Sequence, residues 1–278
     1  MTVRIVTDSA CDLPDQVANE LGIQIVPLSI RFGGDEFVDR QDLTPAEFWQ
    51  RCNASAVLPE TAAPAPGAFE ATYRRLAAEG ATGVVMVALA SGLSATMQSA
   101  QLAATSVADT IPVRVVDSRT ATLGQGMIAV EAARAAAGGA SLDEVVSLAE
   151  ALADRTRVWG ALDTLENLKK GGRIGNAKAL LASVLSIKPI IEIHDGKVEE
   201  GGKQRTRSKA LAFLVDKVRN AGPIENLAVL HAQCSDVDKV VASLREFHTG
   251  EIVVGEIGPV VGSHAGMGTI GVAFQVAG

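Results

Sequence analysis

Residues 84–100, VVMVALASGLSATMQSA, decide how the chain is expected to fold. The apolar run 84–89 predicts a buried strand, and the residues that follow Ser94 predict a helix. A strand that turns through small and hydroxyl residues into a helix leaves backbone N–H groups free to bind an anion. A plainer interpretation stays open, in which Ser94 only caps the helix. The segment predicts one strand–helix unit of an α/β fold and a candidate anion site.

Composition predicts a soluble protein with an aliphatic core. The chain has 278 residues, enough for one large or two ordinary domains. Hydrophobic residues make up 47% and aromatic residues only 4%, so the core must consist mainly of Ala, Val, Leu and Ile. No apolar run approaches the roughly 18 residues of a membrane span, and the first residues are too polar for a signal peptide. We therefore expect a cytoplasmic protein.

Cysteine spacing and charge argue against several classes of protein. Cys11, Cys52 and Cys234 are far apart and lie in no CxxC or Cys/His pattern, so we expect neither a disulfide framework nor a metal site. The net charge of −7 argues against nucleic-acid binding. Residues 163–209 nevertheless contain ten Lys or Arg against six Asp or Glu. This segment predicts either a basic docking surface or simply a solvated face.

Strands and helices are expected to alternate in the first half of the chain. The expected strands are 3–7, 24–30, 84–89 and 113–117. Capping boxes that start at Thr44 and Ser141 predict two helix starts. Gly33 and Gly34 indicate a hairpin excursion near 28–40. The alternation predicts a mostly parallel sheet flanked by helices, in an N-terminal domain of residues 1–157.

Turns in this half carry candidate polar groups. Asp8 and Ser9 follow the first strand, where α/β folds place their sites, although an Asx-type turn explains them equally well. Asp12 can cap the next helix. Residues 58–67 form a proline-rich loop that cannot be a helix or a central strand, and Thr61 is its main hydroxyl.

The second half mixes hairpins with helices. Asp195 and Gly196 stand between two apolar segments and predict a type I′ hairpin turn. Residues 258–268 are expected to form a glycine-rich loop before a last strand. This pattern predicts a mixed sheet in a C-terminal domain of residues 158–278. The fold class is therefore α/β with two domains, and the cleft between the domains is the expected ligand position.

Known catalytic and nucleotide-binding motifs are missing from the sequence. Residues 266–271 match GxGxxG, but an apolar β-like run follows them instead of the helix that a dinucleotide site needs. No P-loop occurs, and no GxSxG elbow surrounds the serines. His264, between small residues, either donates a hydrogen bond to a bound anion or is an ordinary core or solvated histidine. The aliphatic run 180–191 suits core packing and would also suit the lining of an apolar tunnel.

Seven ordered blocks resemble the DegV family over nearly the whole chain. They are IVTDS at 5–9, TAAPAPGAF at 61–69, SGLSATMQSA at 91–100, VDS at 116–118, LENLKKGGRIG at 165–175, RTRSKAL at 205–211 and IGPVVGSHAGMGTIGVAF at 257–274. The resemblance implies a two-domain α/β protein that binds one long-chain fatty acid in a buried apolar tunnel. It further implies the acyl-carrying subunit of a bacterial fatty acid kinase.

The resemblance also implies which residues hold the fatty acid carboxylate. Thr61 matches the family's loop hydroxyl, Ser91 matches the serine of the strand–helix turn, Gly92 offers a backbone N–H, and His264 lies near the head group. This chain has Ala62 where the family's loop often carries a second hydroxyl residue, so loop contacts and chain-length preference are left open.

The resemblance assigns Arg173 and Arg205 to the partner or to a mobile lid. The implied partner is a separate ATP-binding kinase subunit, which would phosphorylate the bound carboxylate. No cofactor is expected, no nucleic acid is expected, and a transient contact with a membrane surface is included among the expected interactions.

The sequence is compatible with two functions. The first is a non-catalytic fatty acid carrier, because a carboxylate held by a helix N-terminus and hydroxyl donors needs no metal or base. Phosphoryl transfer needs Mg²⁺ and a nucleotide cradle, so catalysis is expected in the partner. The alternative is a self-sufficient small-molecule kinase or phosphotransferase that uses the turn from Ser91 to Ser94 for phosphate.

Overall fold

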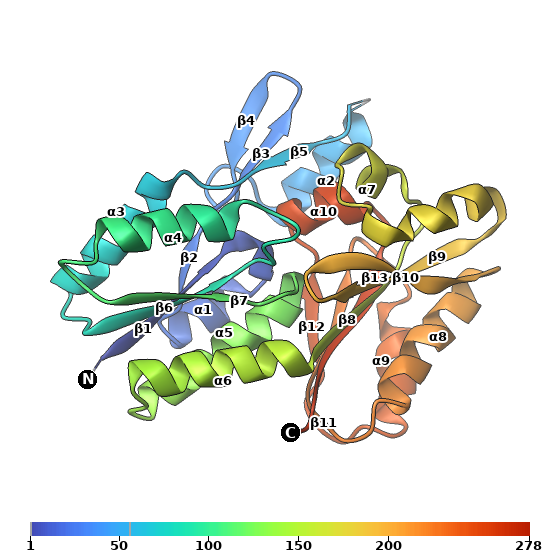
Figure 1. The fold of residues 1–278 in the computed structure, drawn as a ribbon. Helices are drawn as coiled ribbons and strands as arrows, with labels where there is room; N and C mark the ends of the chain where they lie inside the picture. Colours follow the sequence, from blue (N-terminus) through green and yellow to red (C-terminus); the bar gives the residue numbers. More distant parts are fainter. Residues whose placement is uncertain (1, 56) are drawn as a thin grey trace.

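Two large sheets and one small sheet form the fold (Figure 1). The computed structural model describes residues 2–55 and 57–278, and the side chains of 182–186 are outside that description. The first sheet has the order β2-β1-β6-β7 and is parallel throughout. Its strands are β1 (Val3–Asp8), β2 (Gln24–Val26), β6 (Gly83–Ala88) and β7 (Val113–Asp117). The predicted parallel sheet is confirmed.

Helices cover both faces of this sheet because its strands are apolar on both sides. Val84 and Met86 pack against one helical layer, while Val85 and Val87, which point the opposite way along β6, pack against the other. The first layer is α3 (Pro66–Ala78) and α4 (Thr96–Ser106). The second is α1 (Asp15–Glu20), α5 (Thr122–Ala137) and α6 (Leu142–Arg155).

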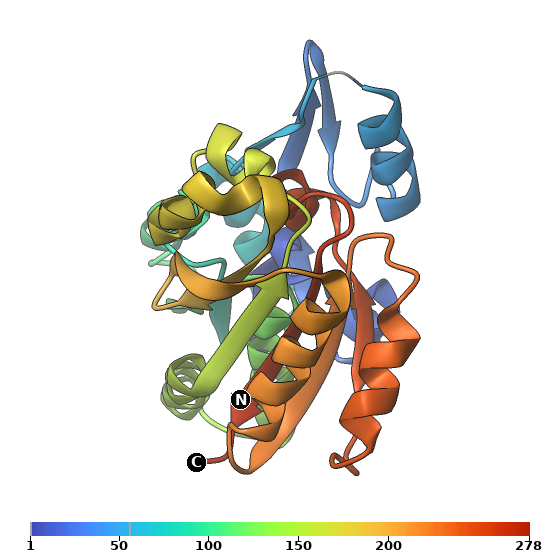
Figure 2. The ribbon, with the colours of Figure 1, turned by 90° about the vertical axis from the view of Figure 1, so that its right-hand side faces the viewer.

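The second sheet is mixed, as predicted. Its order is β10-β9-β8-β13-β11-β12, and of these pairs β11 and β12 are parallel while the others are antiparallel. The strands are β8 (Thr156–Ala161), β9 (Lys188–His194), β10 (Lys197–Gln204), β11 (Ile224–His231), β12 (Val253–Glu256) and β13 (Ile270–Val276). Figure 2 shows α8 (Arg207–Arg219) and α9 (Val237–Arg245) on its outer face. Between β8 and β9 the chain forms α7 (Glu166–Lys170) and the 3₁₀ segment η2 (Gly175–Ser186).

Helix α5 packs against both large sheets. A Cβ at Gly124 would lie 2.5 Å from Cγ2 of Val158 in β8, and a Cβ at Gly126 would lie 2.7 Å from the carbonyl oxygen of Cys11 after β1. These close approaches join the two sheets in one buried apolar cluster. The chain passes from one sheet to the other at β8, next to the expected boundary at 157/158. The division into two domains stays a prediction.

The expected hairpin is confirmed and belongs to a small third sheet (Figure 1). Strands β3 (Ser29–Phe32) and β4 (Asp35–Val38) pair antiparallel, and α2 (Pro45–Ala54) follows from its predicted capping box. Two expectations were wrong. The strand expected at 24–30 is divided between two sheets around Pro27, whose nitrogen cannot donate to a ladder. Part of the expected proline-rich loop forms the edge strand β5 (Glu60–Ala62), which pairs with β3.

Three local expectations need correction. Helix α4 begins at Thr96 with Ala95 as its N-cap, so Ser94 is not the cap residue, although its Oγ accepts from the Thr96 N–H at 3.2 Å. Asp12 does not cap α1, because its carboxylate accepts from distant segments instead. The glycine-rich segment 258–268 contains a helix, α10 (Pro259–Ala265), where a loop was expected.

The structure also bears on the cysteines and on possible membrane-spanning helices. Cys11, Cys52 and Cys234 are free thiols in this structure. Within the described residues, no helix has the length and apolar character needed to cross a bilayer.

Candidate functional site

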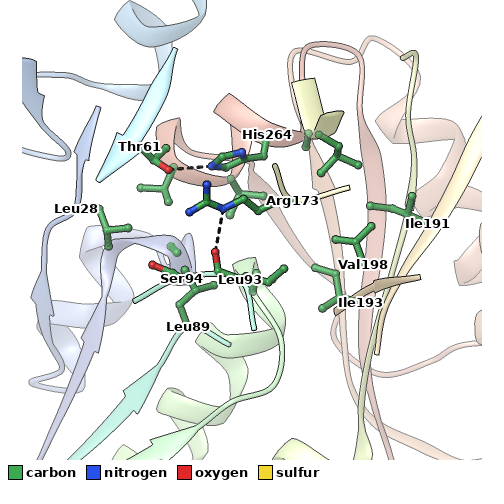
Figure 3. Close-up of a pocket in the computed structure, with 16 residues that line it drawn as sticks. Leu28, Thr61, Leu89, Leu93, Ser94, Arg173, Ile191, Ile193, Val198 and His264 are labelled. Atoms are coloured by element: carbon green, nitrogen blue, oxygen red, sulfur yellow. Dashed lines mark hydrogen bonds between the residues drawn. The ribbon is translucent and has the colours of Figure 1, made fainter. Parts of the chain in front are cut away.

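An apolar cavity of about 80 Å³ lies between the two large sheets (Figure 3). One wall comes from the first half of the chain, one from the β9–β10 hairpin, and one from α10. The apolar lining includes Leu28, Leu89, Leu93, Ile191, Ile193, Val198, Val260 and Val261. Ile191, from the aliphatic run 180–191, is among these residues, whereas the side chains of 182–186 lie outside the described part. The cavity is where a ligand was expected, between segments from both halves.

Polar side chains from four distant segments meet at one end of this cavity (Figure 3). Thr61 on β5 and His264 in the last turn of α10 are hydrogen-bonded, with Oγ1 and Nε2 2.9 Å apart. Arg173, after α7, donates from Nε to the carbonyl of Leu93 at 3.0 Å and from Nη1 to the carbonyl of Gly171 at 2.7 Å. Ser94 also lines the cavity. The wall thus carries two hydroxyls, an imidazole and a guanidinium.

His264 is neutral at physiological pH. Burial and, to a smaller extent, the nearby charge of Arg173 lower its pKa to about 4. Its Nδ1 has no hydrogen-bond partner among the described residues and lies so near Gly171 that a Cβ there would be 2.3 Å away. A buried N–H without an acceptor is rarer than an unpaired acceptor, so we assign the proton to Nε2. The imidazole then donates to Thr61, whose own hydroxyl hydrogen is free to donate elsewhere.

A larger polar basin of about 490 Å³ lies on the other side of this wall. Asn167 and Lys170 line the basin, and it shares Thr61, Arg173 and His264 with the apolar cavity. The same three side chains are therefore reached from both spaces. Such an arrangement can hold the polar head of a ligand whose apolar tail fills the cavity, with the head group facing outward.

Ser91 and Gly92, two of the expected carboxylate ligands, do not line the cavity. Ser91 donates from Oγ to Asp117 Oδ2 at 2.5 Å, and its N–H also points to that carboxylate at 3.3 Å. A phosphate or carboxylate beside Asp117 would be repelled, which disfavours the alternative of a phosphate site at this turn. Gly92 lies against the tip of the β9–β10 hairpin.

Ser94 is the hydroxyl that the residue-level interpretation passed over. It was assigned to helix capping, but it lines the cavity beside Leu93, and its Oγ is 2.8 Å from Thr96 Oγ1. Ser91 and Ser94 are the same residue type in the same turn, so residue type alone does not show which of them faces the cavity. A signal that separates them is Asp117, which ends β7 and accepts a hydrogen bond from Ser91.

The basic residues of 163–209 do not form one free surface. Arg173 lies in the wall of the cavity, although it was expected to serve the partner or a lid. Arg205 is exposed between β10 and α8, outside the cavity lining. Several neighbours are already in ion pairs, namely Lys170 with Glu166, Lys188 with Asp163 and Arg207 with Asp236.

Metal chemistry finds no support in the side-chain arrangement. Across residues 2–55 and 57–278, no three His, Cys, Asp or Glu side chains converge in a way that could hold a metal ion. The polar end of the cavity offers donors suited to an anion.

Comparison with relatives covers the whole chain. A curated DegV domain-containing protein of Streptomyces coelicolor is 36% identical, with 98% of each chain covered. Among solved structures, a DegV family protein of Thermus thermophilus described by its fatty acid binding is 34% identical over the full length of both chains, with a TM-score of 0.90. The fatty acid binding protein DegV of Bacillus subtilis is 28% identical over both full chains, with a TM-score of 0.89.

A third solved structure is described by the particular fatty acid that its protein binds. The stearic acid-binding protein of Eubacterium ventriosum is 26% identical, with 98% of each chain covered and a TM-score of 0.88. The profile of the family described as uncharacterised protein, DegV family, matches residues 2–277. The chain therefore belongs to the DegV family.

Proposed function

We propose that this protein binds one long-chain fatty acid and presents its carboxylate to a separate ATP-dependent kinase subunit, which forms an acyl phosphate. The observation that carries the proposal is an apolar cavity that ends at a wall of hydrogen-bond donors, with a polar basin behind that wall. The related structures described as fatty-acid-binding support the ligand class.

Apolar burial supplies the affinity for such a ligand. Each buried CH₂ group contributes about 0.8 kcal/mol, so a long acyl chain needs few polar contacts. Ligand cavities in proteins usually measure roughly 300–1,000 Å³, whereas this one measures about 80 Å³. The aliphatic walls must therefore move apart when an acyl chain enters.

The polar wall supplies orientation. The second guanidinium nitrogen of Arg173, Nη2, has no acceptor among the described residues, and a charge-assisted bond to a carboxylate suits it. The Thr61 hydroxyl, oriented by His264, provides a second donor. Ser94, which also lines the cavity, provides a third. Ser94 and Arg173 are thus proposed as ligands of the carboxylate together with Thr61, while His264 acts through Thr61.

The polar basin supports presentation of the carboxylate to a partner. Phosphorylation forms a bond between a carboxylate oxygen and the γ-phosphorus of ATP and breaks the bond from that phosphorus to the bridging oxygen. The reaction needs Mg²⁺ and a phosphate cradle, and this chain has no P-loop sequence. A partner that reaches into the basin would meet the carboxylate at the shared wall, next to Lys170.

Mass spectrometry of the purified protein tests the ligand class. Extraction with organic solvent should release one equivalent of long-chain fatty acid, and the delipidated protein should bind palmitate at a one-to-one ratio. Protein that carries no fatty acid and binds none when it is supplied would contradict the proposal.

A kinase assay tests the presentation step. Palmitate-loaded protein should give acyl phosphate with ATP, Mg²⁺ and a bacterial ATP-binding kinase subunit, and should give none with ATP and Mg²⁺ alone. Formation of acyl phosphate by the chain alone would favour a self-sufficient kinase.

A further inference from the structure

The tip of the β9–β10 hairpin rests on loops of the first sheet. The N–H of Gly196 donates to the carbonyl of Arg119 at 2.9 Å, and Gly196 is buried although it lies at a hairpin tip. A Cβ at Gly92 would lie only 2.4 Å from the carbonyl oxygen of Gly196. Arg119 Nη1 is also 3.9 Å from the carboxylate of Asp195. The hairpin thus meets the first sheet through backbone groups that leave no room for a side chain at residue 92.

Asp117 joins the two loops that receive the tip. Its carboxylate accepts from Ser91 Oγ at 2.5 Å and from the N–H of Arg119 at 2.8 Å. Ser91 and Gly92 follow β6, and Arg119 follows β7, so neighbouring strand ends are tied into one platform. The conformation of the tip is equally fixed, because Asp195 and Gly196 have φ of 47° and 73°, as a type I′ turn requires.

The hairpin is the wall of the cavity that lies at the edge of its sheet. It contributes Ile191, Ile193 and Val198 to the cavity lining, and β10 is the edge strand of its sheet. The facing wall is formed by segments next to β6 and α5, which are packed inside the apolar core shared by the two sheets. Because the cavity of about 80 Å³ must widen for an acyl chain, the hairpin is the element expected to move.

We infer that Gly92, Arg119, Asp195 and Gly196 form a latch that holds the hairpin against the first sheet and sets how fast a fatty acid enters and leaves the cavity. The inference rests on the proposed function for the identity of the ligand. In the latch, Gly92 has a positioning role: its missing side chain lets the tip sit close enough for the bond between Gly196 and Arg119.

A latch has a kinetic signature that a head-group contact lacks. Opening the latch exposes the cavity to incoming and outgoing ligand alike, so association and dissociation accelerate together. Loss of a contact to the carboxylate would accelerate dissociation alone, because the encounter with the protein is unchanged.

Gly92→Ala tests the latch, and Gly34→Ala is its matched control. Both glycines have φ outside the left-handed region, but a Cβ at Gly34 meets nothing within 4 Å. Dissociation is measured by mixing palmitate-loaded protein with excess fatty-acid-free albumin, and association by stopped flow with free palmitate. Overpacking at residue 92 should accelerate both rates by about tenfold, with Kd nearly unchanged, while Gly34→Ala matches the wild type.

Asp195→Lys provides a second, milder variant that keeps Gly92. It places two like charges where Arg119 and Asp195 now face each other, at an exposed position. Lys is also less suited than Asp to the positive φ of residue 195, so both effects loosen the tip. Both rates should rise by roughly two- to fivefold, as expected for the loss of a partly exposed ion pair.

Hydrogen exchange of the Gly196 amide tests the latch without any ligand. In the ligand-free protein this amide should be protected by Arg119, and its exchange should accelerate in Gly92→Ala and Asp195→Lys but not in Gly34→Ala. Unchanged exchange in both variants, palmitate rates within twofold of the wild type, or faster dissociation without faster association would each overturn the inference. Failure of the wild type to bind palmitate would instead refute the proposed function, and the amide measurement would still decide whether the contact is a latch.

Discussion

Two buried polar clusters in this protein differ in where the carboxylate comes from. In the first, the carboxylate is the protein's own: Asp8, at the end of β1, accepts from the N–H of Ala10 at 3.1 Å, the N–H of Leu89 at 2.7 Å and Nε2 of Gln125 at 3.0 Å. These bonds join η1 (Ser9–Cys11), the residue that follows β6 and the first turn of α5. The carboxylate of Asp8 is completely buried.

The second cluster consists of donors that face an apolar cavity. Thr61, Ser94 and Arg173 come from three segments, and none of the described residues that line the cavity is an Asp or a Glu. A buried carboxylate that already holds several donors serves the architecture. Donors gathered at the end of an apolar space can instead serve a carboxylate that arrives with an acyl chain.

Asp8→Ala should show the architectural role most strongly. The substitution leaves three donors without a partner and creates a small cavity, so we expect a loss of about 3 kcal/mol or more in the free energy of unfolding. Urea denaturation measures it. Asp35→Ala is the control, since Asp35 is exposed at the start of β4, and it should change stability by less than about 0.5 kcal/mol. If Asp8→Ala were as stable as the control and had lost affinity for palmitate, Asp8 would belong to the ligand site.

Ser94→Ala and Ser91→Ala sharpen the comparison at the level of single hydroxyls. Loss of a donor to a charged group costs about 1.5–3 kcal/mol, so Ser94→Ala should weaken palmitate binding by roughly tenfold or more. Ser91→Ala should leave the equilibrium affinity within about twofold, because that hydroxyl is engaged by Asp117 outside the cavity. Titration calorimetry on delipidated protein measures both. The reverse order of effects would restore Ser91 as the ligand that the family resemblance implies.

The capping-box and turn patterns in the sequence correctly predicted structure that depends on contacts between residues close together in the chain. Thr44 and Ser141 each form the reciprocal bonds of a capping box, as their spacing to a glutamate indicated. Asp195 and Gly196 form the predicted turn because both adopt positive φ. In each case the deciding contacts lie within a few residues, so no knowledge of the remaining fold was needed.

Contacts between distant segments could not be predicted in the same way. Gly262 belongs to the segment that was expected to be a glycine-rich loop, yet it lies inside α10, where a Cβ would be 2.8 Å from the ring of Trp49. That glycine permits close packing, and its partner is more than 200 residues away. Thr61 and His264, bonded at a separation of 203 residues, were proposed together only through family resemblance. Their role toward a carboxylate stays a prediction.

The two clusters should also respond to pH with opposite signs. Burial raises the pKa of Asp8 from 3.8 to about 6, despite the hydrogen bonds that favour its ionised form. Burial, with a smaller effect of Arg173, lowers the pKa of His264 from 6.5 to about 4. Between about pH 4 and pH 6 the folded protein therefore holds a proton on Asp8 that the unfolded chain has released. Over about the same range the unfolded chain holds a proton on His264 that the folded protein excludes.

Linkage turns these proton differences into slopes of stability against pH. Stability rises with pH where the unfolded state binds more protons, by at most about 1.4 kcal/mol per pH unit for one group. The stability advantage of the wild type over Asp8→Asn should thus fall as pH rises from 4 to 6, while its advantage over His264→Gln should grow from pH 4 to 6.5. Urea unfolding at half-unit pH steps measures both differences, in which the contributions of other groups cancel. If the two stability differences changed with pH in the same direction, burial would not be the cause of both pKa shifts, of Asp8 and of His264. The two clusters would then not differ in their electrostatics.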